Sequence, residues 1–219
     1  MERSGQFVEF LMGGLAQLGF SITDSQVSDF IFYYKELIAW NKKINLTTIT
    51  QDKEIAVKHF LDSLAYNRVL ALFSNHNESV LDVGSGAGFP GLPLKICYPG
   101  LDLTLLEPNA KKTAFLRHII GKLRLKKTVV LAKRFQELSR EPTYLGCYRY
   151  IVTRAIAVEQ ILPFARPLLA EKGFVVLGRS KPLEDRTDPY GLRVAREVAF
   201  SLPYGYGKRV LTVVEPSDL

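Results

Sequence analysis

The sequence predicts an α/β fold with a mostly parallel seven-stranded sheet, an antiparallel C-terminal hairpin and a helical N-terminal extension. From residue 79 onward, short apolar runs alternate with segments of helical periodicity, which is typical of strands joined by crossover helices. Before that point the apolar residues recur at helical spacing. We therefore expect a helical extension over residues 1–75 and an α/β domain over residues 76–219.

The extension is expected to contain two helical segments separated by a polar break. Residues 24–40 form the first segment, with Asp24 or Ser25 as the expected N-cap. The polar sequence NKKINLTT (41–48) interrupts the pattern, and residues 52–73 resume it. The apolar positions of the first segment recur three and four residues apart: Val27, Phe30, Ile31, Tyr34, Leu37 and Ile38.

Seven short apolar runs are the expected strands. Five of them are SVLDVG (79–84), LDLTLLE (101–107), TVVLAK (128–133), YRYIVTRA (148–155) and GFVVLG (173–178). The last two, VAFSLPY (198–204) and RVLTVVEP (209–216), are joined only by Gly-Tyr-Gly. Because this connection is too short for a parallel crossover, we expect an antiparallel hairpin.

Positive charge is concentrated in one part of the chain. The net charge is +7, and residues 111–149 hold 11 lysines and arginines against 2 acids. In the helical segment that opens this block, Lys111, Arg117 and His118 lie opposite an apolar stripe. Such a block favours an anionic partner such as nucleic acid, although a solvated helix face that only aids solubility has the same composition.

The composition also indicates where the protein is located and whether it binds a metal ion. No apolar run approaches the ~18 residues of a membrane span, and the first residues lack the layout of a signal peptide, so we expect a cytoplasmic protein. The two cysteines, Cys97 and Cys147, are too few for a disulfide framework. The three histidines are scattered, so we expect no metal site.

The glycine-rich sequence GSGAGFPG (84–91) marks the expected ligand site. It follows the first strand, where an open α/β sheet binds its ligands. Gly84, Gly86 and Gly88 leave no side chain between the backbone and a ligand. The pattern fits the phosphates of a dinucleotide or the methyl donor S-adenosylmethionine, and a purely structural turn is the third reading.

S-adenosylmethionine is favoured over a dinucleotide by Pro90, Pro93 and Asp82. A pyrophosphate is held by free backbone N–H groups, and Pro90 and Pro93 each remove one from this region. Asp82 in the first strand suits a cationic ligand. Glu107 ends the second strand, where a carboxylate accepts hydrogen bonds from the hydroxyls of a ribose. Both NAD and S-adenosylmethionine contain such a ribose, so this residue does not distinguish between them. The alternative is that Glu107 only caps the following helix.

The residues at the end of the fourth strand limit which kind of acceptor atom could receive a methyl group. This end of the strand lacks both the cysteine used for attack through a pyrimidine carbon and the Asn/Asp-Pro-Pro-aromatic sequence that serves base amino groups. A ring nitrogen such as guanine N7 carries no proton and needs no general base, so in-line placement suffices. Arg154 stands there among apolar neighbours and is expected to anchor the donor carboxylate, a phosphate or a base edge.

The chain resembles the family of small-subunit ribosomal RNA guanine-N7 methyltransferase G, also called glucose-inhibited division protein B. Five motifs in the family's order carry the resemblance: WNKKINLTT (40–48), KHFLDSL (58–64), LDVGSGAGFPGLPLKI (81–96), LLEPNAKKTAFLR (105–117) and VTRAIA (152–157). The resemblance implies a Rossmann-like class I methyltransferase domain. It also implies S-adenosylmethionine as methyl donor, with S-adenosylhomocysteine as product, and a guanine N7 in the decoding-region loop of 16S ribosomal RNA as acceptor.

The motif match also implies roles for single residues. Donor-binding residues are expected at Asp82, Gly84, Gly86, Gly88, Phe89, Glu107, Phe135, Gln136 and Arg154. Arg154, Lys111 and Arg134 are the expected catalytic group. Substrate-binding or pocket-closing residues are expected at Asn41, His59, Asp62, Lys112, Arg117 and Arg179.

The chain departs from the family pattern at three places. Gln136 stands where an acid is common, and Glu107 where relatives often have aspartate. The sequence LGRSK (177–181) replaces Leu-Lys-Gly after the fifth strand, which leaves the basic role to Arg179 or Lys181.

The partner that the resemblance implies is small-subunit ribosomal RNA or the 30S particle, and we expect a monomer that does not contact membranes. A nicotinamide-dependent oxidoreductase is the rival enzyme class, but the chain after Arg154 is short for a substrate domain. A basic RNA-binding protein with a vestigial pocket is the third hypothesis.

Overall fold

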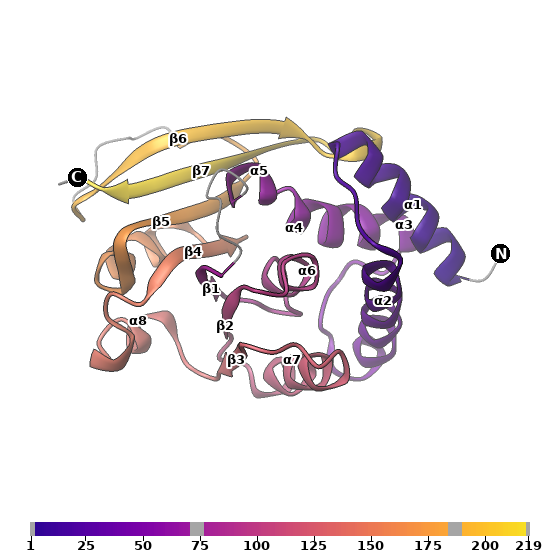
Figure 1. The fold of residues 1–219 in the computed structure, drawn as a ribbon, viewed down its shortest axis with the longest axis horizontal. Helices are drawn as coiled ribbons and strands as arrows, with labels where there is room; N and C mark the ends of the chain where they lie inside the picture. The colour runs from indigo at the N-terminus through magenta and orange to yellow at the C-terminus, as the bar shows by residue number, and fades with distance from the viewer. Residues whose placement is uncertain (1–2, 71–76, 184–189, 218–219) are drawn as a thin grey trace.

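A seven-stranded sheet forms the centre of the computed structural model, which describes residues 3–70, 77–183 and 190–217 (Figure 1). The strand order is β3-β2-β1-β4-β5-β7-β6. Strands β1 to β5 are parallel, and β7 runs antiparallel to both β5 and β6, so the predicted fold class is confirmed. The strands are β1 (Ser79–Val83), β2 (Asp102–Leu106), β3 (Thr128–Leu131), β4 (Tyr148–Arg154), β5 (Leu169–Arg179), β6 (Leu192–Ser201) and β7 (Lys208–Pro216).

Two strands begin earlier than the apolar runs predict. Strand β5 starts at Leu169, and its pairing with β4 shifts register between Tyr148 and Tyr150. Strand β6 starts at Leu192 and lies at the edge of the sheet, with a register shift between Val194 and Arg196. Irregular and half-solvated strand segments contain polar residues, so the apolar pattern does not reveal them.

One of the N-terminal helices runs further than the sequence predicts. Helix α2 (Asp24–Ile44) continues through the first half of the expected break, and Asn45 after it lies in the left-handed region. Its N-cap is Thr23, one residue before the expected position: the hydroxyl accepts from the Gln26 amide, and the Gln26 side chain accepts from the Thr23 amide. The other helices here are α1 (Arg3–Leu18), α3 (Asp52–Ile55), α4 (Asp62–Leu64) and α5 (Asn67–Leu70).

A π-helical turn, Ala56–Leu61, joins α3 to α4. Side-chain periodicity does not distinguish this hydrogen-bond pattern from an α-helix, so the sequence predicted only a continuous helical segment. Such turns occur often at functional sites, and this one carries Lys58 and His59.

Helices cover both faces of the sheet. The later helices are α6 (Gly91–Cys97), α7 (Ala110–Lys122), α8 (Phe135–Leu138) and α9 (Leu162–Ala165). One core cluster joins Phe30 of α2 and Phe60 of the π-helical turn to Val80 and Val152 of the strands. The other packs α8 and the segment around residues 161–169 against the alternate strand residues. In Figure 1, α6 and the N-terminal helices lie on one side of the sheet and α8 on the other.

The N-terminal helices therefore share a core with the sheet. The predicted boundary at residue 75 between the extension and the α/β domain lies outside the described residues. Within the described ranges, no helix has both the length and the apolar character needed to cross a membrane.

Candidate active site

The glycine turn after β1 has the backbone conformation that its composition predicts. Gly84, Gly86 and Gly88 have φ angles of 69°, 58° and 99°, in the left-handed region that favours glycine. A Cβ on Gly84 would overlap the Ile156 side chain, and one on Gly88 would overlap Tyr33. Gly86 has open space beside it, so only its φ angle requires glycine.

The two predicted acids near this turn occupy different environments. Glu107, at the end of β2, accepts from the backbone amides of Gly86 and Asn109, both at 2.9 Å. Asp82 is fully buried beneath the turn, where one oxygen accepts from the Gly91 amide at 2.8 Å and the other has no partner among the described residues. Burial raises the pKa of Asp82 to about 7.

A first cavity of about 600 Å³ opens at the carboxyl ends of β1, β2 and β4. Six of the predicted site residues line it: Gly84, Glu107, Arg134, Phe135, Gln136 and Arg154. Leu106, Ile156 and Ile161 add apolar surface to the same wall. A fixed carboxylate for ribose hydroxyls, an apolar lining for adenine and a glycine without a side chain fit S-adenosylmethionine.

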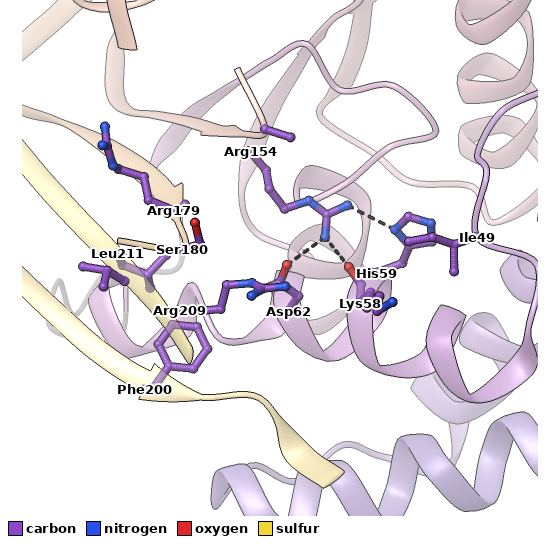
Figure 2. Close-up of a pocket in the computed structure, with 13 residues that line it drawn as sticks. Ile49, Lys58, His59, Asp62, Arg154, Arg179, Ser180, Phe200, Arg209 and Leu211 are labelled. Carbon is purple, nitrogen blue, oxygen red and sulfur yellow. Dashed lines mark hydrogen bonds and ion pairs between the residues drawn. The ribbon is translucent and has the colours of Figure 1, made fainter. Parts of the chain in front are cut away.

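Arg154 is held by three hydrogen bonds (Figure 2). Its Nη1 donates to the Lys58 carbonyl at 2.6 Å and to Asp62 Oδ2 at 3.2 Å, and its Nη2 donates to His59 Nδ1 at 3.2 Å. The guanidinium lies 5.6 Å from the centroid of the Phe89 ring, on which the His59 ring stacks at 4.6 Å. Phe89 therefore lies beneath Arg154 and His59, packed among aromatic side chains.

His59 connects Arg154 to the polar segment after α2. Because Nδ1 accepts from Arg154, Nε2 carries the proton and donates to Thr47 Oγ1 at 2.8 Å. The Thr47 amide donates to Asn41 Oδ1 at 2.8 Å, and Asn41 Nδ2 donates to the Thr47 carbonyl at 2.9 Å. Burial, with the charges of Arg154 and Lys58, lowers the pKa of His59 to about 3, so the ring is neutral at pH 7.

The sequence motifs 40–48, 58–64 and 152–157 thus form one polar network. Motif matching singled out Asn41, His59, Asp62 and Arg154, and the structure brings them together. It did not single out Thr47, although the residue belongs to the first motif and links Asn41 to His59.

A second cavity of about 390 Å³ adjoins the first, and Arg154 and Ala155 line both. Ala155 has a φ angle of 60°, a strained conformation for a residue with a side chain. The second cavity also contains the predicted residues His59, Asp62 and Arg179. Lys181, the alternative to Arg179, is exposed.

The sequence did not single out the side chains that the C-terminal hairpin contributes to the second cavity. Arg209 of β7 places Nε 3.5 Å from Asp62 Oδ1, and Phe200 of β6 forms part of the apolar wall. Both belong to the C-terminal hairpin, where the sequence offered only an alternation of apolar and polar residues and no motif.

The basic helix α7 lies beside a third cavity of about 820 Å³, which Asn41, Thr47, His59 and Lys112 line. Lys111 and Arg117 are exposed on the helix surface, as predicted. His118 differs from that prediction, because its Nε2 lies 2.6 Å from Glu36 Oε2 of α2. The roles predicted for the individual site residues all stay predictions, including the catalytic role of Lys111, Arg134 and Arg154 and the donor contacts of Asp82, Gly86, Gly88 and Phe89.

Solved structures define the class to which this fold belongs. TrmN from Thermus thermophilus matches with a TM-score of 0.57 at 18% identity, covering 71% of this chain and 48% of that chain. A SAM dependent methyltransferase from Aquifex aeolicus matches with a TM-score of 0.52 at 17% identity, covering 70% and 91%. The fold is that of S-adenosylmethionine-dependent methyltransferases, which confirms the fold class that the resemblance implied.

Sequence comparison identifies the family. The model of rRNA small subunit methyltransferase G matches residues 26–190. Ribosomal RNA small subunit methyltransferase G of Dehalococcoides mccartyi (strain CBDB1) is 38% identical over 94% of this chain and 89% of the relative. The corresponding protein of Lactococcus lactis is 32% identical over 96% and 91%. The chain belongs to this methyltransferase family.

Family and fold together confirm S-adenosylmethionine as the expected cofactor. They also set aside the rival hypothesis of a nicotinamide-dependent oxidoreductase.

Proposed function

We propose that the protein transfers a methyl group from S-adenosylmethionine to N7 of one guanine in the decoding-region loop of 16S ribosomal RNA. Membership in the methyltransferase G family supports ribosomal RNA as the substrate class. The observation that favours a ring nitrogen as the acceptor atom is the state of the ionisable groups around Arg154.

Each described histidine and carboxylate that lines the first two cavities already interacts with another group of the protein. Both nitrogens of His59 are hydrogen-bonded, and the low pKa of the ring makes it a weak base. Asp62 lies between Arg154 and Arg209. Glu107 is bonded to two backbone amides. A guanine N7 loses no proton on methylation, so these residues need only position the reactants.

The residues have distinct proposed roles. When bound, S-adenosylmethionine supplies a methyl group that its sulfonium already activates. Glu107 would hold the ribose hydroxyls, and Phe135 and Gln136 would contact the adenosine part from the opposite wall of the first cavity. Arg154 would hold the methyl donor and the acceptor base in fixed positions relative to each other, because it lines both cavities and is itself fixed by Asp62 and His59.

The basic residues supply the proposed RNA contact. Lys111 and Arg117 are exposed on α7, and Arg134 is exposed while also lining the first cavity. Cations in these places would neutralise phosphates beside the target nucleotide. We propose that the protein acts as a monomer in the cytoplasm, on small-subunit RNA or the 30S particle.

The test is methylation of small ribosomal subunits from cells that lack this modification. Purified protein and labelled S-adenosylmethionine are added, and the RNA is cleaved chemically at N7-methylguanine. The proposal predicts one labelled guanine, located in the decoding-region loop. Label at another atom or at many positions would contradict it.

A binding experiment separates the enzyme from an RNA-binding protein with a vestigial pocket. S-adenosylhomocysteine should raise the melting temperature, whereas NADH should leave it unchanged. An RNA-binding protein without a working donor pocket would bind subunits yet show no stabilisation by S-adenosylhomocysteine.

A further inference from the structure

The second cavity is the space from which an acceptor can approach a donor held in the first. Arg154 and Ala155 separate the two cavities and line both. A volume of about 390 Å³ suits a single base and not a stacked duplex. Enzymes that modify a base within structured nucleic acid take that base out of its stack. We propose that the second cavity binds the unstacked target guanine, an inference that rests on the function proposed above.

The wall of the second cavity has the composition of a base-binding site. Phe200, Val210 and Leu211 of the C-terminal hairpin provide an apolar surface for a planar ring. Figure 2 shows Phe200 and Leu211 on the hairpin side, across from Arg154 on β4 and the helical turn that carries His59. An apolar surface with a few fixed polar groups is typical of small-ligand sites.

Asp62 is the one carboxylate among the described residues that line this cavity. Its Oδ2 pairs with Arg154 at 3.2 Å and its Oδ1 with Arg209 at 3.5 Å. A carboxylate offers about four acceptor positions, so each oxygen keeps one for a ligand. The Watson–Crick edge of guanine presents two adjacent donors, N1–H and the N2 amino group, which match two carboxylate oxygens. Adenine lacks this pair of donors.

The placement of Asp62 also leaves N7 accessible. The Arg154 side chain extends from β4 toward Asp62 (Figure 2), and Ala155 directly follows Arg154 in the chain. A purine lying along this side chain with its Watson–Crick edge at Asp62 has its imidazole ring, and therefore N7, toward Ala155. Because Ala155 borders the first cavity, N7 faces the donor. Asp62 is thus a specificity-determining residue.

Inosine at the target position tests this role, because it keeps N7 and N1–H and lacks only the N2 amino group. Subunits are reconstituted with 16S RNA that carries guanosine or inosine at the methylated position, and single-turnover rates are measured. Losing one hydrogen bond to a charged group should slow the wild-type protein on inosine by roughly 10- to 100-fold. In Asp62→Ala the guanosine-to-inosine rate ratio should fall to about 1, as expected for a coupled pair.

Two controls isolate this effect. Asp102→Asn changes an exposed acid at the amino end of β2, far from the carboxyl ends of the strands, and should keep the wild-type ratio. Stabilisation by S-adenosylhomocysteine shows that Asp62→Ala remains folded with a working donor site. Asp62→Asn, which is closer in shape, serves if the alanine variant does not fold.

Each outcome has a definite meaning. Equal wild-type rates on guanosine and inosine would overturn the inference without any variant. A variant that slows both substrates equally and keeps the ratio would assign Asp62 a structural role only. If wild-type protein forms no N7-methylguanine on guanosine subunits, the proposed function fails and the inference fails with it. If that product forms and the ratio does not depend on Asp62, only the inference fails.

Discussion

Replacing Arg154 by alanine should weaken the fold and stop methyl transfer. The guanidinium joins the end of β4 to the π-helical turn and to α4 through the Lys58 carbonyl, His59 and Asp62. Arg154→Ala removes all three hydrogen bonds. It leaves Asp62 with Arg209 alone, at 3.5 Å.

The magnitude follows from the burial of the pair. The side chains of Arg154 and Asp62 are only 17% and 9% exposed. Removing one partner of a buried ion pair costs about 3–5 kcal/mol. For a chain of 219 residues, 1 kcal/mol corresponds to about 2–4 °C, so the melting temperature should fall by roughly 6–20 °C. Arg154→Lys keeps the charge and should lose less stability, although it cannot reproduce the forked contacts.

Urea denaturation of the wild type and both variants measures this loss, and single-turnover methylation of subunits is followed at a temperature where all three are folded. We expect no turnover for Arg154→Ala. A stability loss below about 1 kcal/mol, which is the typical size for an exposed ion pair, would refute the reasoning about the network. Wild-type turnover in the folded alanine variant would refute the role of Arg154 between the cavities.

Four further predictions concern ligand affinity, pH and salt. Glu107→Gln should weaken S-adenosylhomocysteine binding by about 10-fold or more in calorimetry, because the variant has no charged acceptor for the ribose hydroxyls. The pKa of His59 is about 3 in the folded protein and near 6.5 when unfolded, so the unfolded state binds more protons between these values. Stability should therefore fall as pH drops through this window, by up to about 1.4 kcal/mol per pH unit, and His59→Gln should lose this dependence in urea titrations. Asp82 has the opposite sign: its pKa of about 7 exceeds the unfolded value of 3.8, so its contribution falls as pH rises between them, and Asp82→Asn should remove that slope. The double variant Lys111→Ala, Arg117→Ala should reduce the slope of log K for subunit binding against log salt by about 1 for each phosphate that the protein no longer neutralises, whereas an unchanged slope would place the RNA elsewhere.

The opposed slopes of His59 and Asp82 have a consequence for the wild type. Between about pH 4 and 6.5 the two contributions cancel in part, so the single variants should show stronger pH dependence than the wild type. Identical pH profiles for all three proteins would contradict both assignments.

The architecture could be predicted because the central parallel strands are buried on both faces and appear as apolar runs. Strand β1 is such a run, and the short Gly-Tyr-Gly connection specified the hairpin. The early part of β6 could not be predicted in the same way. It lies at the sheet edge, where alternate residues face solvent and polar side chains are tolerated.

Some residues of the candidate site could likewise be predicted from the sequence, and others could not. The glycine turn and Glu107 follow from strand order alone, because both lie at carboxyl ends of neighbouring strands. The link between Asn41 and Arg154 depends on a π-helical turn and on a contact between His59 and Arg154, which lie 95 residues apart in the sequence. The motifs indicated which residues belong to the site, but not how these residues are connected. Arg209 has no local signal, because only the pairing of β7 with β5 brings it to Asp62.

The most direct test of the central claim changes one atom of the substrate. Subunits are reconstituted with 7-deazaguanosine at the methylated position, which replaces N7 by a carbon and leaves the Watson–Crick edge intact. Wild-type protein should bind these subunits as tightly as normal subunits and transfer no methyl group to that nucleotide. Methyl transfer to the 7-deaza nucleotide at the normal rate would contradict the claim that N7 is the acceptor.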